Sequence, residues 1–153
     1  MFLLDTNVVS ELHKAIRGKG DPLVTAWLAQ INLSTCFLSS MTLMELEVGV
    51  LRMERRDATQ GALLRAWLDQ RVVPEFAGRV LAVDEAVARR CARLHVPDPC
   101  PERDALIAAT ALVHGMTVVT RNVDDFVPTG ALLFNPWQPW TVQETTGRYV
   151  VDD

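Results

Sequence analysis

The chain has 153 residues, of which 49% are hydrophobic and 22% charged, and this length suits one domain with a sizeable core. It has no run of 18 uncharged apolar residues and no secretory pattern at its N-terminus, so we expect a cytoplasmic protein without a membrane partner. Three cysteines, an odd number, also suit a reducing compartment. A net charge of −4 argues against a basic nucleic-acid coat, but not against an enzyme that reaches phosphates through metal ions.

Short apolar runs alternate with amphipathic segments along the chain, which predicts strands alternating with helices. Because the apolar runs are short and uniformly apolar, they indicate a parallel sheet covered on both faces, an α/β sandwich with four to five strands. The predicted helices begin near residues 6, 22, 42, 57, 85 and 104, and Gly115 ends the last of them. The predicted strands are, in order, Leu3-Leu4, 35–40, 79–84, 116–120 and 131–134.

Several helix starts carry candidate capping residues. Thr6 or Asn7 can cap the first helix, and Asp84 can cap the helix that begins at residue 85. Thr42 and Glu45 have the spacing of a capping box for the long helix.

Acidic residues cluster in the predicted topology at the edge where parallel sheets bind ligands, outside the carboxyl ends of the strands. Asp5 follows the first strand, Glu45 lies in the first turn after the second, and the turn 120–125 follows the fourth. Asp104 joins them only if its helix begins at this edge, which the pattern leaves open. Asp5 is available for function because two neighbours can cap. Glu45 and Asp104 have alternative roles at helix starts, and the acids of the turn have one as turn residues.

Other charged and nucleophilic residues form no recognisable site. The histidines fall on three different helices without metal-ligand spacing, and there is no glycine-rich phosphate loop or serine elbow. Glu47 and Glu54 lie beside the arginines at 52, 55 and 56, which predicts a solvated charged helix face.

Four segments taken together resemble the PIN-domain toxins of the VapC type, and the TRN turn and the NPW ending look most like the FitB-like branch. The resemblance runs in order from Phe2 to about Trp137. It implies a PIN-like three-layer α/β/α sandwich with a central parallel sheet over residues 1–137, and a tail, 138–153, that packs on the domain or extends from it. The segments are MFLLDTNVVSEL, SSMTLMELEVGV, PERDALIAATALVHGMTVVTRNVDDF and LLFNPW.

The same resemblance implies an acidic catalytic site. Asp5, Glu45 and Asp104 match the metal ligands, and Asp125 matches a fourth acidic position better than its neighbour Asp124 does. Many relatives carry an acid where this chain has Asn122, which leaves open whether a second metal ion is held. The implied substrate-binding and pocket-bracing residues are Asn7, Thr120, Arg121 and Asn122.

The implied function is that of a type II toxin, an endoribonuclease dependent on Mg²⁺ or Mn²⁺ that hydrolyses single-stranded or looped RNA. The implied partners are a cognate antitoxin and a second copy of the chain. Such hard cations prefer carboxylate oxygens, acidify bound water and neutralise charge at phosphorus. Without a cation the packed acids repel one another, so at least one should have a raised pKa.

Two other hypotheses fit parts of the pattern. An inactive PIN-fold scaffold protein finds support in Asn122 at the altered acidic position. A receiver-type signalling domain also has acids at strand ends, with Asp84 as the phosphorylated acid and Thr120 as the switch hydroxyl. Receivers carry paired acids after the first strand and a lysine after the last, whereas this chain offers only Asp5 and Asn135.

Overall fold

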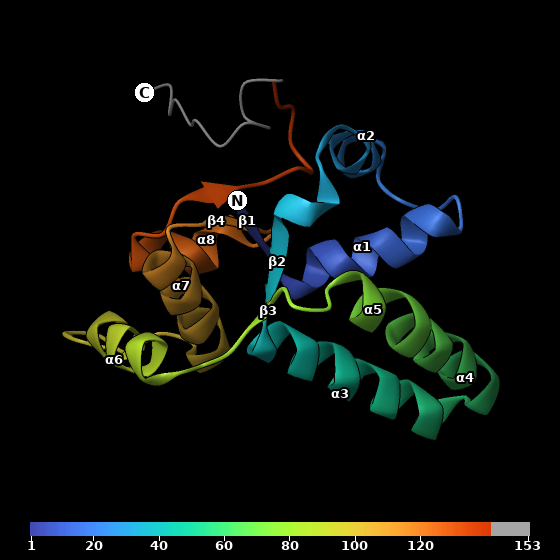
Figure 1. Cartoon of the computed structure of the whole chain (residues 1–153), viewed down its shortest axis with the longest axis horizontal. Coiled ribbons are helices and arrows are strands. Elements are labelled where there is room, and N and C mark those ends of the chain that lie inside the picture. Colours follow the sequence, from blue (N-terminus) through green and yellow to red (C-terminus); the bar gives the residue numbers. More distant parts are fainter. Residues whose placement is uncertain (142–153) are drawn as a thin grey trace.

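A computed structural model describes residues 1–141, and within this range five strands form one parallel sheet in the order β3-β2-β1-β4-β5 (Figure 1). The strand β1 lies in the middle, where Phe2 pairs with Cys36 on one side and with Thr117 on the other. The predicted three-layer α/β/α sandwich with a parallel sheet is confirmed. The strands are β1 (Phe2–Leu4), β2 (Cys36–Ser39), β3 (Val80–Leu81), β4 (Thr117–Val119) and β5 (Leu133–Phe134).

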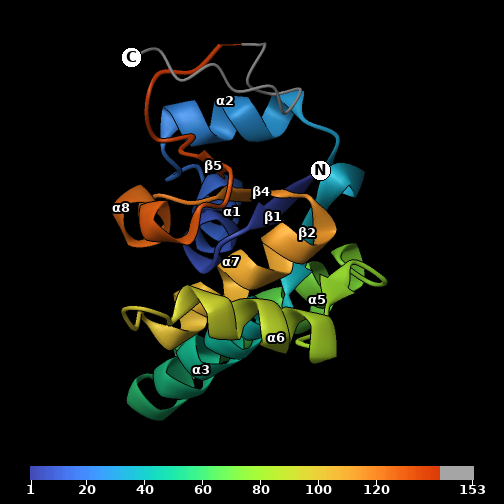
Figure 2. The ribbon, with the colours of Figure 1, turned by 90° about the vertical axis from the view of Figure 1, so that its left-hand side faces the viewer.

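Helices lie on both sides of the sheet, with α2 on one side and α6 and α7 on the other (Figure 2). No helix in the described range is long and apolar enough to cross a membrane. Short helical turns, η1 (Leu33–Thr35), η2 (Leu68–Val72) and η3 (Val127–Thr129), complete the connections. The helices are α1 (Thr6–Ile16), α2 (Pro22–Gln30), α3 (Ser40–Arg56), α4 (Ala58–Trp67), α5 (Val73–Glu75), α6 (Glu85–Leu94), α7 (Glu102–His114) and α8 (Val123–Phe126).

Alternate residues of β1 face two separate cores. Phe2 and Leu4 pack with Trp27 of α2 in a core that also takes in α1 and α3. Leu3 points the other way and packs with Ile107 of α7. Because both faces of β1 are covered, its residues are almost fully buried. The first polar side chain after the strand is that of Asp5.

Two predicted helix caps differ in the structure. Asp5, rather than Thr6 or Asn7, caps α1. The helix α3 begins at Ser40, and Ser39 caps it by accepting a hydrogen bond from Met41 N at 3.1 Å. The predicted capping box is therefore wrong: Thr42 lies inside the helix and is fully buried. The cause is that β2 runs directly into α3, so the last strand residue takes the capping position.

The region between α3 and β3 also differs from the predictions. Leu63 of α4 is 57% exposed, whereas Leu68 and Val72 of the π-helical turn η2 are buried. The strand β3 ends at Leu81 and does not reach Asp84, which nevertheless caps α6 through Val87 N at 3.0 Å, as predicted.

The charged face expected at Glu47 and Glu54 is partly exposed to solvent, and the two acids also form ion pairs that the sequence did not predict. Both bind Arg65 of α4, with N–O distances of 2.7 Å to Glu47 and 2.9 Å to Glu54. The guanidinium thus fastens α4 against α3, although the ion pairs are partly exposed and each contributes little to stability.

The C-terminal tail is described only up to residue 141. Trp140 donates its indole N–H to the carbonyl oxygen of Leu23 at 3.2 Å, so the first tail residues pack on α2. The rest of the predicted tail, 142–153, lies outside the described residues, and the boundary at 137 stays a prediction.

Gly61 marks the closest approach of α4 to α3. A Cβ atom there would come within 2.7 Å of Glu54 N and closer still to Glu54 Cα. We expect Gly61→Ala to lower the free energy of unfolding by about 2 kcal/mol, because the two backbones must move apart. Urea unfolding followed by circular dichroism measures this effect.

The matched control is Gly49→Ala, since Gly49 lies inside α3 with nothing near its missing side chain. Alanine there should raise the free energy of unfolding by about 0.5–1 kcal/mol through its higher helix propensity. Equal effects of the two substitutions would contradict the close approach of the helices.

Candidate active site

The carboxylate of Asp5 lies at the end of the central strand and is only 6% exposed. Its Oδ1 accepts a hydrogen bond from Thr6 N at 2.8 Å, which caps α1, and its Oδ2 accepts one from Thr120 Oγ1 at 2.7 Å. The negative charge therefore lies at the positive end of a helix dipole. One side chain joins the first helix to the segment that follows β4.

Glu45 approaches Asp5 through a shared partner, Thr6. The Thr6 hydroxyl donates to Glu45 Oε1 at 3.1 Å, while the Thr6 amide donates to Asp5. Because α3 starts at Ser40, Glu45 lies in its second turn and not in the first as expected. Sequence reasoning missed this bridge, since Thr6 resembled a capping residue and its partner lies 39 residues away.

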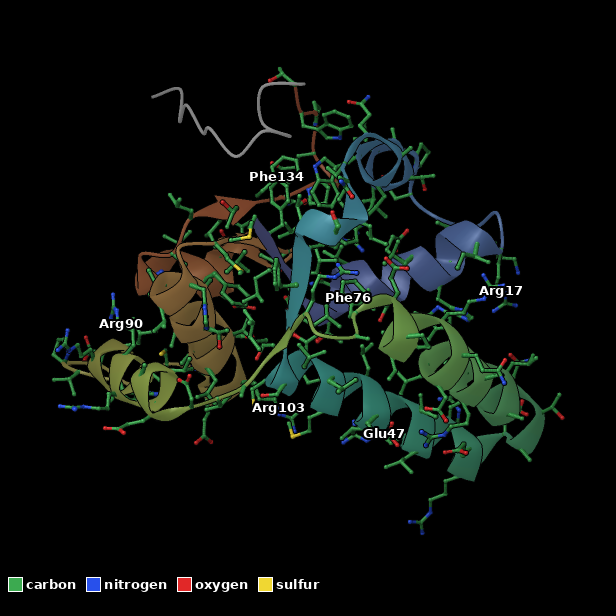
Figure 3. The ribbon with its side chains drawn as sticks, viewed as in Figure 1. Arg17, Glu47, Phe76, Arg90, Arg103 and Phe134 are labelled. Atoms are coloured by element: carbon green, nitrogen blue, oxygen red, sulfur yellow. The ribbon has the colours of Figure 1, made fainter. Side chains whose placement is uncertain are left out.

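The first turn of α7 brings Asp104 to the same edge, which answers a question that the sequence left open. The preceding residue, Arg103, extends toward the start of α3 (Figure 3) and lies 3.9 Å from Glu45 Oε2. The charges of Asp5 and Glu45 both act on Asp104. The three predicted metal ligands are thus brought together at one edge of the sheet.

Burial and mutual repulsion alter the acidity of these groups. Burial, followed by the negative charges of Asp5, Asp125 and Glu45, raises the pKa of Asp104 to about 6. Burial also raises the pKa of Asp5, although the hydrogen bonds from Thr120 and Thr6 oppose the rise. The pKa of Glu45 is raised by burial and by the charge of Asp5, against the Thr6 hydrogen bond and the charge of Arg103. Carboxyl groups whose pKa values are raised in this way are typical of functional sites.

Thr120 and Asn7 hold the turn after β4 in place. Thr120 Oγ1 donates to Asp5 and accepts from Asn122 N at 3.0 Å and from Asn7 Nδ2 at 3.5 Å. The amide of Arg121 donates to Asn7 Oδ1 at 3.4 Å. Asn7 and Thr120 therefore brace the site, which is one of the two roles that the sequence analysis gave them, the other being substrate binding.

The remaining predicted residues line a surface hollow of about 310 Å³. Asp125 and Asn122 face this hollow, and Asp125 is close enough to Asp5 and Asp104 for its charge to raise their pKa values. Arg121 also lines it, with its guanidinium 5.6 Å from the centre of the Trp137 ring. Asp125 thus extends the acidic set outward to the surface.

The donor chemistry of this site fits a hard divalent cation, because every candidate ligand is a carboxylate oxygen. Within residues 1–141, however, no three acidic, histidine or cysteine side chains are arranged as a complete metal-binding group. Mg²⁺ commonly uses one or two carboxylates together with waters and substrate phosphates, so a complete protein cage is not required.

A comparison with protein families identifies the domain that carries this acidic site. The PIN domain model matches residues 2–129, and the chain belongs to the PIN-domain family. This excludes the receiver-type hypothesis.

Within that family the chain is similar to FitB and VapC toxins. It is 38% identical to toxin FitB of Neisseria gonorrhoeae over 143 residues, which cover 90% of this chain and 99% of FitB. It is 37% identical to VapC ribonuclease Y4jK of Sinorhizobium fredii, over 91% of this chain and 99% of Y4jK. The solved structure of FitAB bound to an IR36 DNA fragment superposes with a TM-score of 0.82 at 35% identity, covering 93% of this chain and 99% of that one.

The raised pKa of Asp104 predicts a pH-dependent stability of the metal-free protein. Its ordinary value is 3.8, and in the folded protein it is about 6, so folding favours the protonated form. The contribution of Asp104 to stability is therefore largest below about pH 4 and is lost as the pH rises to about 6 and above. Asp104→Asn removes this loss.

The measured quantity is the free energy of unfolding of Asp104→Asn minus that of the unchanged protein. We expect this difference to be about 1 kcal/mol larger at pH 7.5 than at pH 4.5. A full shift of this size would give more, but Asp104 is partly exposed and solvent screens its charge. Urea unfolding in the presence of a chelator measures both proteins at each pH. A difference that does not change with pH would contradict the raised pKa of Asp104.

Proposed function

We propose that this chain is the toxin of a type II toxin–antitoxin pair and that it cleaves RNA as a metal-dependent endoribonuclease. The observation that carries the proposal is the meeting of Asp5, Glu45, Asp104 and Asp125 at one edge of the sheet. The similarity to a VapC ribonuclease and to toxin FitB over most of the chain supports it.

Asp5, Glu45 and Asp104 are the proposed ligands of Mg²⁺ or Mn²⁺. Such an ion supplies, when bound, the positive charge that acidifies a water molecule and offsets the charge of the scissile phosphate. It also offsets the burial and the mutual repulsion that make these acids resist ionisation in the metal-free protein. Asp125, next to the hollow, completes the acidic set on the side where a nucleic-acid strand can enter.

The polar neighbours fix the acids and receive the strand. Thr6 orients Asp5 and Glu45 together, and Thr120 fixes the second oxygen of Asp5. Arg103 touches Glu45 only at 3.9 Å, so it can turn to a phosphate at little cost. Arg121, at the rim of the hollow, can contact another phosphate, and the substrate is single-stranded or looped RNA, whose bases are accessible.

The proposed partners are an antitoxin and a second copy of the chain, acting in the cytoplasm. A toxin–antitoxin complex from Klebsiella pneumoniae has this fold and superposes with a TM-score of 0.60 at 25% identity, and FitAcB from Neisseria gonorrhoeae superposes with a TM-score of 0.82 at 36% identity. An antitoxin that covers this chain's acidic edge would prevent RNA from entering.

Asp5→Asn tests the nuclease directly. The amide oxygen of asparagine can still accept the hydrogen bond from Thr6 N, so the cap of α1 is retained while the charge is lost. We expect cleavage of single-stranded RNA with Mn²⁺ to fall by on the order of 100-fold, comparable to the loss of one charge-stabilising group. Gel electrophoresis of labelled RNA measures the rate, and urea unfolding verifies the fold.

Equal RNA cleavage by the two proteins would contradict the assignment of Asp5. If neither protein cuts RNA in Mg²⁺ or Mn²⁺, the alternative of an inactive PIN-fold scaffold replaces the nuclease proposal.

Metal binding has a readout that needs no RNA. Saturating Mn²⁺, at about 100 times its dissociation constant, should stabilise the folded chain by about 2.7 kcal/mol. This corresponds to a rise of roughly 5–10 °C in melting temperature, which a chelator should reverse. Asp104→Asn should remove most of this rise. The same response in both proteins would show that the ion binds elsewhere.

A further inference from the structure

Two surface hollows meet at Asp124 and Asp125 of α8. The first, of about 310 Å³, is the hollow already described beside Arg121. The second, of about 510 Å³, lies between the loop that joins α6 to α7 and the start of η3. Asp125 belongs to the acidic set of the candidate active site and lines both hollows, so both open at that set. A strand that crosses the acids from one hollow to the other passes over this site.

The first hollow is rich in side-chain amides, which come from Asn122, Asn135 and Gln138. Asn135 Oδ1 accepts a hydrogen bond from Trp137 N at 3.0 Å, which fixes this amide and leaves its N–H groups for a ligand. An amide presents a donor and an acceptor side by side, which is the arrangement that pairs with the edge of a nucleobase. Asp124 adds an acceptor at the same wall.

The second hollow has a different character. Val96, which is 74% exposed, lines it together with Pro97 and Pro128, and Arg93 lies at its rim. Exposed apolar side chains grouped beside charged ones commonly mark a binding surface. The flat face of a nucleobase can cover such a surface, and an arginine beside it can bind the phosphate.

We propose that the two hollows hold the nucleotides on either side of the scissile phosphate and that the amide-lined hollow selects the base. An exocyclic amino group can donate to the side-chain oxygen of Gln138, with Asp124 at the same wall. Uracil has no such group: its N3–H is its only donor on the pairing edge and lies between two carbonyl oxygens, which the Gln138 oxygen and the Asp124 carboxylate repel. The hollow therefore favours adenine, cytosine or guanine over uracil. This proposal rests on the proposed function, because it assigns the strand that the acids cleave.

Gln138→Ala tests the base selection. Short single-stranded RNAs that differ only in one base beside the cleaved bond are incubated with each protein, and the rates are compared. The unchanged protein should cut the amino-bearing series at least about tenfold faster than the uracil series, and the variant should lose most of this ratio. The control is Gln60→Ala, since Gln60 lies on α4, away from both hollows, and should keep the ratio.

The absence of any base preference at the positions next to the cut would overturn the proposal. So would a preference that Gln138→Ala leaves intact.

Cys100 offers a second test that does not depend on cleavage. It lines the second hollow and is partly exposed, whereas Cys36 and Cys91 are buried. A single-stranded RNA bound to Asp5→Asn in Mn²⁺ should slow alkylation of Cys100 by N-ethylmaleimide at least fivefold, as measured by mass spectrometry. A polyanion without bases, such as heparin, at equal charge concentration should slow it less.

The two tests separate the two proposals. If RNA protects Cys100 but is not cleaved, the proposal that the hollows bind nucleotides is supported while the nuclease function is contradicted. If RNA is cleaved but does not protect Cys100, the proposal that the hollows bind nucleotides is contradicted while the nuclease function is supported.

Discussion

The structure depends on one buried carboxylate at the end of the central strand. Since β1 is flanked by β2 and β4 and covered on both faces, Asp5 is its first side chain that can reach the edge of the sheet. A buried charge needs hydrogen-bond partners, and Asp5 takes them from Thr6 and Thr120. These partners belong to the first helix and to the segment after β4. The bonds that satisfy one charge therefore also fix the two chain segments that form the site.

The gathered acids oppose folding, and apolar packing elsewhere holds them together. Glu45 lies on α3, which packs Leu46 and Val50 into the core on one face of the sheet. Asp104 lies on α7, whose buried face is made largely of alanines such as Ala105 and Ala108. Small side chains let this helix approach the sheet closely, which carries its first turn to the edge. Local repulsion is thus tolerated because it is confined to a few side chains at the rim of two well-packed cores.

The sequence predicted most of the fold and the edge at which Asp5 and Glu45 lie, because both follow from local patterns, whereas the pattern left the place of Asp104 open. Short apolar runs indicate parallel strands, and the carboxyl ends of parallel strands share an edge wherever the helices lie. What the sequence could not supply are contacts between distant residues, such as Thr6 with Glu45 or Arg65 with Glu47. Local motifs also failed where tertiary structure competed with them. The spacing of Thr42 and Glu45 fitted a capping box, but a strand that ends at Ser39 leaves no room for one.

The charge of the molecule is compatible with a nucleic-acid substrate because cations surround the acids locally. The overall charge of −4 would repel a phosphate backbone if it acted at long range. At physiological ionic strength, however, a charge is screened over about 8 Å, so the strand responds mainly to the groups nearest to it. Arg103 lies beside Glu45, while Arg121 and Arg93 line the two hollows that share Asp125. Under the proposed function a divalent ion adds positive charge at the centre of these arginines. The RNA strand would then bind beside the metal ion. Without the ion, the acids would repel one another and also the phosphates of the substrate.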